Sequence, residues 1–297
     1  MIKLIIGDNM KRLLKILMYL LIILIILRII NYLSINISYH IDKNKYTETF
    51  TINGIHNSYI PQGLTYSDKY NVILQTSYNK NNKVSMLYIS DFNSKKLLKE
   101  IKLKNINNTN NTSHVGGICT DNNKLWITND YSIDEFNLDE VINNSTNKYI
   151  KPIKNTKINT RGDFITYHDN SLYVGEFQLK PFYNTNHDTP IMIKYNSNTY
   201  EEEDAFEIPK MVQGLVIDED NYFIFSRSYS HFTRSYLNYY KYDKNFNSKN
   251  LIKKIKIPPM AEDMFYKDKY LYVLFESNAD RYFYAIPKIK KVLKIKK

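Results

Sequence analysis

Six side chains that can bind a ligand or move a proton stand beside short strand-like segments of this 297-residue chain. Carboxylates, guanidinium groups and imidazoles form charge-assisted hydrogen bonds and act as general acids and bases. The same groups also form structural ion pairs when they are buried, so that alternative stays open. The residues that we expect to contact a ligand are His114, Arg161, Glu176, Arg227, Glu262 and Glu276.

These residues lie close to a segment that recurs about every fifty residues. Each copy is followed by a few polar residues and a second strand-like run, and four of the five copies carry glycine at the same place. Short strands repeated at this spacing are typical of a β-propeller, and five copies predict five blades. Coincidental strand starts are the alternative. The copies are Pro61-Gln62-Gly63-Leu64, Val115-Gly116-Gly117-Ile118, Arg161-Gly162-Asp163-Phe164, Val212-Gln213-Gly214-Leu215 and Ala261-Glu262-Asp263-Met264.

The order of strands within a blade predicts that the polar residues converge. We call the four strands a to d from the central channel outward. Strands a and b are antiparallel, so the start of a and the end of b lie on one face of the ring. The b–c loops open on this face too, and the longest, Phe177–Pro190, is a candidate lid. We expect Gln62 and Gln213, which also begin a strands, to fix the ring, and the six charged residues above to serve the ligand.

Closure of the ring is predicted to involve the start of the propeller sequence. The last blade is expected to use Asp263–Tyr266, Leu271–Phe275 and Arg281–Ile286 for strands a to c. Its outer strand is either Glu48–Ile52 or Lys291–Ile295, and we favour the N-terminal segment. Either closure removes exposed sheet edges, which would otherwise pair with other chains.

The N-terminal region is predicted to anchor the chain. Leu13–Leu33 is apolar and long enough to span a bilayer, and the lysines and arginines that precede it predict a cytoplasmic N-terminus. We expect an uncleaved signal anchor in the cell membrane, with the propeller outside; a cleaved signal is the alternative. The predicted organisation is a cytoplasmic end (1–12), a transmembrane helix (13–33), a tether (34–46) and the propeller (47–297).

The charge balance argues against a nucleic-acid partner. Of the 41 basic residues, five lie in residues 1–34 and six in 288–297. The region between them holds 30 basic and 29 acidic residues, so the net charge of +11 is an effect of the chain ends. Cys119 is the only cysteine, so the sequence predicts a fold without an internal disulfide.

Four motifs resemble those of secreted or membrane-anchored bacterial β-propellers of the gluconolactonase/strictosidine-synthase-like kind. They are His114–Ile118, Val174–Phe177, Ser226–Tyr229 and Leu274–Ser277. The resemblance implies a divalent cation held by oxygen ligands in the channel. On this basis Glu176, Glu262 and Asp263 are candidate ligands for Ca²⁺, a cation that prefers carboxylate oxygens.

The first repeat, Pro61–Leu64, is also similar to the opening of the five-bladed glutamine cyclotransferases. In that family a glutamate at the end of the next strand serves the chemistry. This sequence has Gln75-Thr76-Ser77-Tyr78 there, without a carboxylate. The sequence therefore predicts a membrane-anchored ligand-binding or scaffold module for an extracellular small molecule, glycan or peptide. The alternative is an enzyme at the same face, either a metal-dependent hydrolase or lactonase or a cyclotransferase, and no catalytic residue is assigned.

Overall fold

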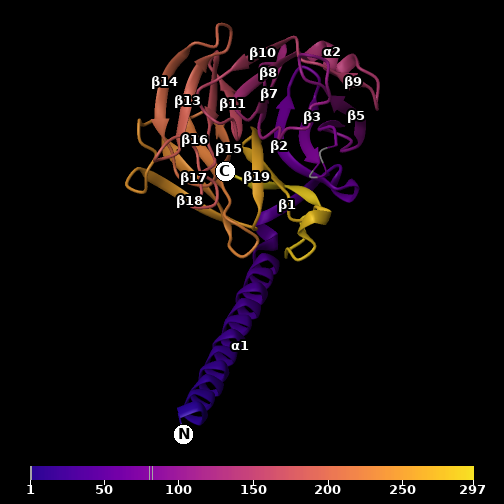
Figure 1. The fold of residues 1–297 in the computed structure, drawn as a ribbon. Helices are drawn as coiled ribbons and strands as arrows, with labels where there is room; N and C mark the ends of the chain where they lie inside the picture. The colour runs from indigo at the N-terminus through magenta and orange to yellow at the C-terminus, as the bar shows by residue number, and fades with distance from the viewer. Residues whose placement is uncertain (1, 80, 82) are drawn as a thin grey trace.

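The computed structural model describes residues 2–79, 81 and 83–297, and over these residues it confirms a five-bladed β-propeller. The first four blades follow the chain in order, each as an antiparallel sheet (Figure 1). Their strands, from the channel outward, are β2 (Tyr59–Ser67), β3 (Val72–Asn79), β4 (Met86–Asp91) and β5 (Leu97–Leu103); β6 (Ile118–Thr120), β7 (Lys124–Asn129), β8 (Ser132–Asn137) and β10 (Lys154–Lys157); β11 (Phe164–His168), β12 (Ser171–Gly175), β13 (Ile191–Asn196) and β14 (Glu202–Glu207); and β15 (Val212–Ile217), β16 (Tyr222–Arg227), β17 (Ser235–Lys241) and β18 (Leu251–Ile257).

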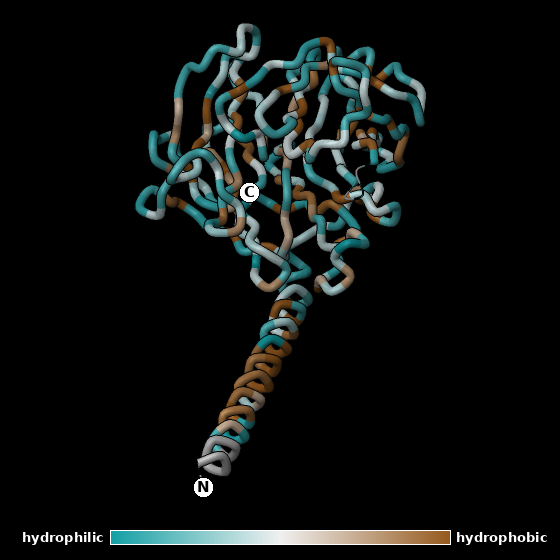
Figure 2. The backbone as a smooth tube through the Cα atoms, in the orientation of Figure 1, coloured by the Kyte–Doolittle hydropathy of each residue, from teal (hydrophilic) through white to brown (hydrophobic). Residues whose placement is uncertain are grey.

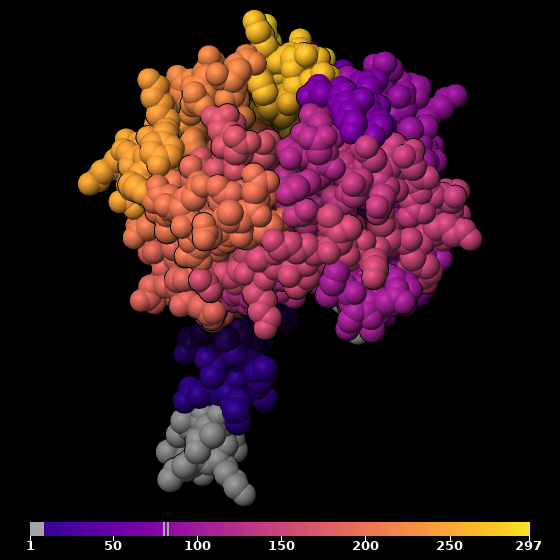
Figure 3. Space-filling model, turned by 90° about the horizontal axis from the view of Figure 1, so that it is seen from above, coloured from indigo at the N-terminus to yellow at the C-terminus, as the bar shows by residue number. Residues whose placement is uncertain are grey.

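The fifth blade closes the ring with strands from both ends of the propeller sequence. Its order is β19 (Ala261–Lys267), β20 (Tyr270–Phe275), β21 (Lys291–Lys296) and β1 (Tyr46–Thr51). The outer pair is antiparallel, with Tyr46 opposite Ile295. Figure 3 shows the result, in which late segments lie beside early ones around the ring. The favoured N-terminal closure is therefore confirmed.

The predicted third strand of this blade, Arg281–Ile286, is wrong. The segment instead forms a 3-10 turn at Asp280–Tyr282 followed by a loop. Phe283 and Tyr284 are exposed there, and Pro287 has no N–H to donate to a sheet. The following Lys291–Lys296 buries Val292, Leu293 and Ile295, which gives that strand the apolar surface that a blade needs. Strand c is therefore β21.

Close contact between the innermost strands explains the repeated glycines. A Cβ atom on Gly117 would lie 2.4 Å from the backbone nitrogen of Ile165 in the next blade. One on Gly214 would lie 2.5 Å from a carboxylate oxygen of Asp263. No larger residue fits such positions without moving a backbone, because interiors are packed at crystal density. The repeated glycines therefore lie where the innermost strands of neighbouring blades contact one another at the channel.

Two short elements lie between β8 and β10 in the chain. Helix α2 (Leu138–Asn143) follows β8 and is capped by the side chain of Asn137, which accepts a hydrogen bond from the Glu140 N–H. Strand β9 (Tyr149–Ile150) pairs in parallel with β5 of the first blade. The segment 149–157 is therefore divided between two sheets, since only Lys154–Lys157 belongs to the second blade.

The N-terminal helix α1 (Ile2–Asp42) is longer than predicted and projects from the propeller (Figure 1). Figure 2 shows its apolar middle. In the described residues, one helix is long and apolar enough to cross a membrane, and its apolar window is fully exposed; an anchor and a signal sequence both fit this finding. In the segment predicted as a tether, 34–46, the helix continues to Asp42 and η1 (Lys43–Lys45) leads into β1. Ile35 and Tyr39 are buried, which holds this end of the helix against the propeller.

Candidate functional site

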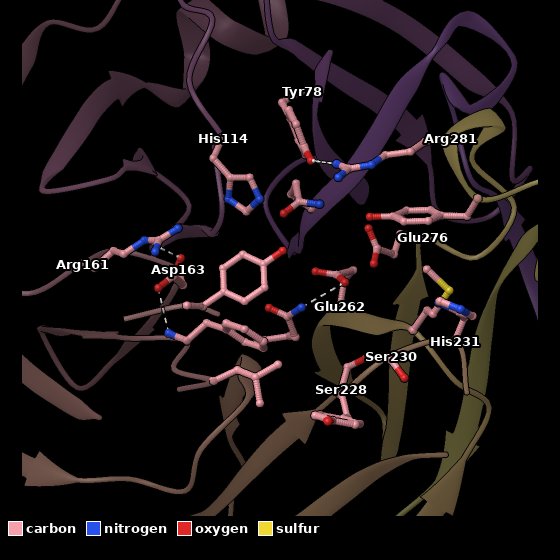
Figure 4. Close-up of a pocket in the computed structure, with 18 residues that line it drawn as sticks. Tyr78, His114, Arg161, Asp163, Ser228, Ser230, His231, Glu262, Glu276 and Arg281 are labelled. Carbon is pink, nitrogen blue, oxygen red and sulfur yellow. Dashed lines mark hydrogen bonds and ion pairs between the residues drawn. The ribbon is translucent and has the colours of Figure 1, made fainter. Parts of the chain in front are cut away.

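The predicted convergence on one face produces a pocket of about 420 Å³ at the mouth of the channel (Figure 4). Every blade contributes the residue at the start of its innermost strand or just before it. The ends of the second strands and the b–c loops complete the wall. The strand-start residues in the wall are Gln62, His114, Arg161, Gln213 and Glu262; the other polar or charged lining includes Tyr78, Asp163, Ser228, Ser230, His231, Glu276, Arg281 and Tyr282.

Irregularities in three innermost strands aim side chains at this pocket. The pairing of β2 with β3 shifts register between Pro61 and Leu64, around Gln62. The corresponding shifts in the fourth and fifth blades surround Gln213 and Glu262. A β-bulge turns a side chain away from the regular alternation, and bulges concentrate at the rims of barrels and next to active sites. The bulges therefore explain why these residues, which lie in strands, still reach the pocket.

The most unusual chemistry in the pocket comes from two carboxyl groups in the fifth blade. Glu262 and Glu276 lie side by side in Figure 4, and a hydrogen bond joins their side chains. Burial, reinforced by the neighbouring Glu276, raises the pKa of Glu262 well above its usual value. Burial also raises the pKa of Glu276 to about 7, although hydrogen bonds from Tyr282 and Glu262 and the charge of Arg281 oppose the rise. Both carboxyl groups therefore hold their protons at higher pH than an exposed glutamate does, and the pKa of Glu276 lies near neutrality.

The opposite wall of the pocket carries Arg161, which is paired with a buried carboxylate. The Nε atom of Arg161 lies 3.1 Å from a carboxylate oxygen of Asp163, and the other oxygen of that carboxylate accepts a hydrogen bond from the Phe177 N–H. Burial raises the pKa of Asp163 to about 6, against the influence of Arg161. Burial and the nearby arginines lower the pKa of His114 to about 4, so this imidazole is neutral at pH 7. The ring of His114 packs against Tyr78 at 4.8 Å between centroids.

Arg281 was placed in a strand by the sequence prediction and was missed as a pocket residue. It reaches the pocket from the loop between β20 and β21 and donates a hydrogen bond to the Tyr78 hydroxyl at 3.0 Å. Tyr282 follows it, and burial beside Glu276 raises the pKa of its phenol far above the usual value. One feature of the sequence could have indicated this loop: the interval between Phe275 and the last strand is long enough to form one.

Two of the six predicted contact residues lie outside this pocket. Glu176 is fully buried beneath the loop that follows β12, where its carboxylate contacts His187 Nδ1 at 2.9 Å and accepts a hydrogen bond from the Ile191 N–H. Arg227 turns outward from the end of β16, and its Nε donates to the Lys210 carbonyl. The structure brings His114, Arg161, Glu262 and Glu276 together and assigns Glu176 to holding the loop.

The predicted cation ligands do not form a metal site. Glu176 serves the loop, and the Asp263 carboxylate accepts hydrogen bonds from the N–H groups of Leu64 and Met264 at 2.9 and 2.8 Å. Only Glu262 of the three faces the pocket. Across the described residues, no group of three or more His, Cys, Asp or Glu side chains is arranged to hold a metal ion. The candidate Ca²⁺ set therefore does not fit, because two of its three carboxylates are committed to backbone and side-chain partners.

The predicted lid, Phe177–Pro190, does border the pocket. Phe177, Leu179 and Tyr183 belong to its lining. Gln178 fastens the loop internally, since its Nε2 donates to the His187 carbonyl at 2.9 Å. Gln62 and Gln213, which we expected to fix the ring, also face the pocket, where the Gln213 amide contacts Glu262 at 3.2 Å.

Comparison with known proteins defines the class of fold. No protein-family model matches the chain, and no curated protein matches it. A solved glutaminyl cyclase from Myxococcus xanthus is similar over 84% of this chain and 93% of its own, with a TM-score of 0.54 and 6% identity. The WD40 β-propeller domain of Doa1 is similar over 84% of this chain and 96% of its own, with a TM-score of 0.43 and 9% identity. The likeness to the glutaminyl cyclase supports the propeller fold, and the gluconolactonase-like resemblance stays a prediction.

Proposed function

We propose that this protein is a membrane-anchored propeller that binds a small ligand of mixed charge in the pocket of its loop face. In this proposal α1 crosses the bilayer, with the N-terminus in the cytoplasm and the propeller outside. The exposed apolar surface of α1 and the basic residues in its N-terminal part support this orientation. The observation that carries the binding function is a pocket with a carboxyl pair on one wall and an arginine on the other.

The charged and polar groups on the two walls of the pocket indicate the chemical class of the ligand. Arg161 offers an anionic group a guanidinium with several N–H donors, and its Nε lies against Asp163 in the pocket wall. Glu262 and Glu276 offer an amine or another donor two carboxyl groups that share a hydrogen bond. A ligand with an amine at one end and a carboxylate or carbonyl oxygen at the other matches both walls. Small amino acids and the N-terminal residues of peptides have this pattern.

A second candidate function is proton-transfer catalysis by the same carboxyl pair. A carboxyl group with a pKa of about 7 both accepts and releases protons near neutral pH, which is the property of a general acid or base. In cyclisation of an N-terminal glutamine, the α-nitrogen bonds to the side-chain carbonyl carbon, the bond to the amide nitrogen breaks, and ammonia leaves. The carboxylate of Glu276 would take the proton from the amine, and protonated Glu262 would supply one to the departing nitrogen.

Titration of the full-length protein with L-glutamine and with the dipeptide Gln-Gly tests both functions. We expect saturable binding by calorimetry, weakened about tenfold or more by Arg161→Met, because a charge-assisted hydrogen bond contributes about 1.5–3 kcal/mol. Arg227→Met is the matched control, since it removes an arginine outside the pocket. Equal loss in both variants, or no binding by the wild type, contradicts the proposed ligand class. Ammonia release from Gln-Gly that Glu276→Gln abolishes would establish the catalytic function.

A further inference from the structure

The contacts between α1 and the propeller determine which face of the propeller points toward the membrane. The Asn31 side-chain amide donates a hydrogen bond to the Phe232 carbonyl at 2.9 Å, and the Tyr32 hydroxyl donates to the Tyr284 carbonyl at 2.9 Å. Arg28 stacks over the Phe232 ring, 4.6 Å from its centroid. Phe232 and Tyr284 belong to the b–c loops of the fourth and fifth blades, and Figure 1 shows that α1 projects away from the propeller on the side of these loops.

These contacts place the loops beside the end of the apolar helix segment. Arg28 to Leu33 covers about 8 Å of helix, at 1.5 Å per residue. The same six residues close the apolar stretch that begins at Leu13. When this stretch occupies the hydrocarbon core, the carbonyls of Phe232 and Tyr284 therefore lie at the level of the lipid headgroups.

The b–c loops of the third, fourth and fifth blades expose aromatic side chains, which suit a position at the level of the lipid headgroups. Phe283 is 82% exposed and Phe182 is 77% exposed, the two highest values among the large apolar residues of 46–297 in the described chain. Tyr183, Tyr229 and Tyr284 are also exposed, and all five lie in the b–c loops of the third, fourth and fifth blades. Tyr183 and Tyr229 line the same pocket, so the loops are neighbours around its mouth. Clustered exposed apolar residues mark an interaction surface, and aromatic rings favour the membrane interface.

We propose that the pocket-bearing face of the propeller rests on the bilayer that α1 crosses, with the aromatic residues of these three loops in the headgroup layer. The inference rests on the membrane span proposed above. The bilayer is the occupant because the aromatic surface is continuous with the apolar surface of α1 through Phe232 and Tyr284. In this arrangement the mouth of the pocket opens at the lipid surface, and a ligand reaches it from the interface between lipid and water.

Tryptophan fluorescence of the full-length protein in nanodiscs tests the proposal. The natural Trp126 is fully buried and supplies the same background in every variant. Phe283→Trp probes the loop face. Tyr242→Trp is the matched control, since Tyr242 is 54% exposed just beyond the end of β17, at the opposite end of the blade. The nanodiscs contain either ordinary phosphatidylcholine or the same lipid brominated in its acyl chains, which quenches indole fluorescence on contact.

We expect brominated lipid to quench F283W and to leave Y242W unchanged. Equal response of the two variants overturns the proposal. Leu24→Trp places a tryptophan in the middle of α1, so it tests the membrane span separately from membrane contact by the loops. Quenching of L24W without quenching of F283W refutes membrane contact by the loops while the span holds, whereas no quenching of L24W refutes the span and with it the proposal. Quenching of F283W in discs holding one copy also excludes a second copy as the occupant of the surface.

Discussion

Replacing Glu276 by glutamine should make the protein more stable above neutral pH. The pKa of this carboxyl is about 7 in the folded chain, against 4.5 in the absence of burial. Because folding raises the pKa, the folded state binds the proton more tightly than the unfolded state does. Binding of this proton stabilises the folded state fully below pH 4.5, and this stabilisation is lost as the pH rises through 7.

The size of the effect follows from the two pKa values of Glu276. At about 1.4 kcal/mol per pKa unit, the rise from 4.5 to about 7 corresponds to a loss of about 3 kcal/mol between acid and neutral pH. Glutamine has nearly the same shape, can bond to Glu262 and Tyr282, and does not titrate. We expect Glu276→Gln to gain up to about 3 kcal/mol over the wild type at pH 8, and no such gain below pH 4.5.

Urea unfolding of the full-length protein in detergent measures this difference. Curves are recorded at about pH 4, 5, 6, 7 and 8, a range that brackets the titration of Glu276 in both the unfolded and the folded chain, with the fluorescence of the buried Trp126 as reporter. Glu201→Gln is the matched control, since Glu201 is exposed. Parallel pH profiles for the wild type and Glu276→Gln would show that burial does not raise the pKa of this carboxyl, and they would remove the acid–base argument for the pocket.

Three further predictions concern the framework that supports the pocket. Gly117→Ala should lower the unfolding free energy by about 1–3 kcal/mol, since the new methyl group meets backbone of the next blade, and the urea midpoint measures the loss. Trp126→Phe should cost about 1–3 kcal/mol, because the buried Tyr200 hydroxyl loses its hydrogen bond from the indole at 2.8 Å; an unchanged melting temperature contradicts this. Asp42→Asn removes the countercharge 3.7 Å from the buried Arg234, so residues 34–45 should exchange their amide hydrogens faster than in the wild type.

The repeat was sufficient to predict much of the architecture. Its spacing predicted the number of blades, and the antiparallel order of strands predicted the face on which His114, Arg161 and Glu262 meet. The N-terminal strand was also recognised as the closure of the ring. These features depend on local alternation and on connectivity, both of which can be read along a single chain.

Contacts between distant segments decided the rest. Glu176 and Glu276 both follow the second strand of a blade, yet one holds a loop and the other faces the pocket, because the loops packed over them differ. The bulge at Glu262 depends on the register with the neighbouring strand, which no local pattern records. The docking of α1 on the loop of Phe232 likewise joins residues two hundred positions apart. The sequence by itself therefore determined the blades and the polar face, whereas tertiary packing decided which side chains form the pocket and which way it points.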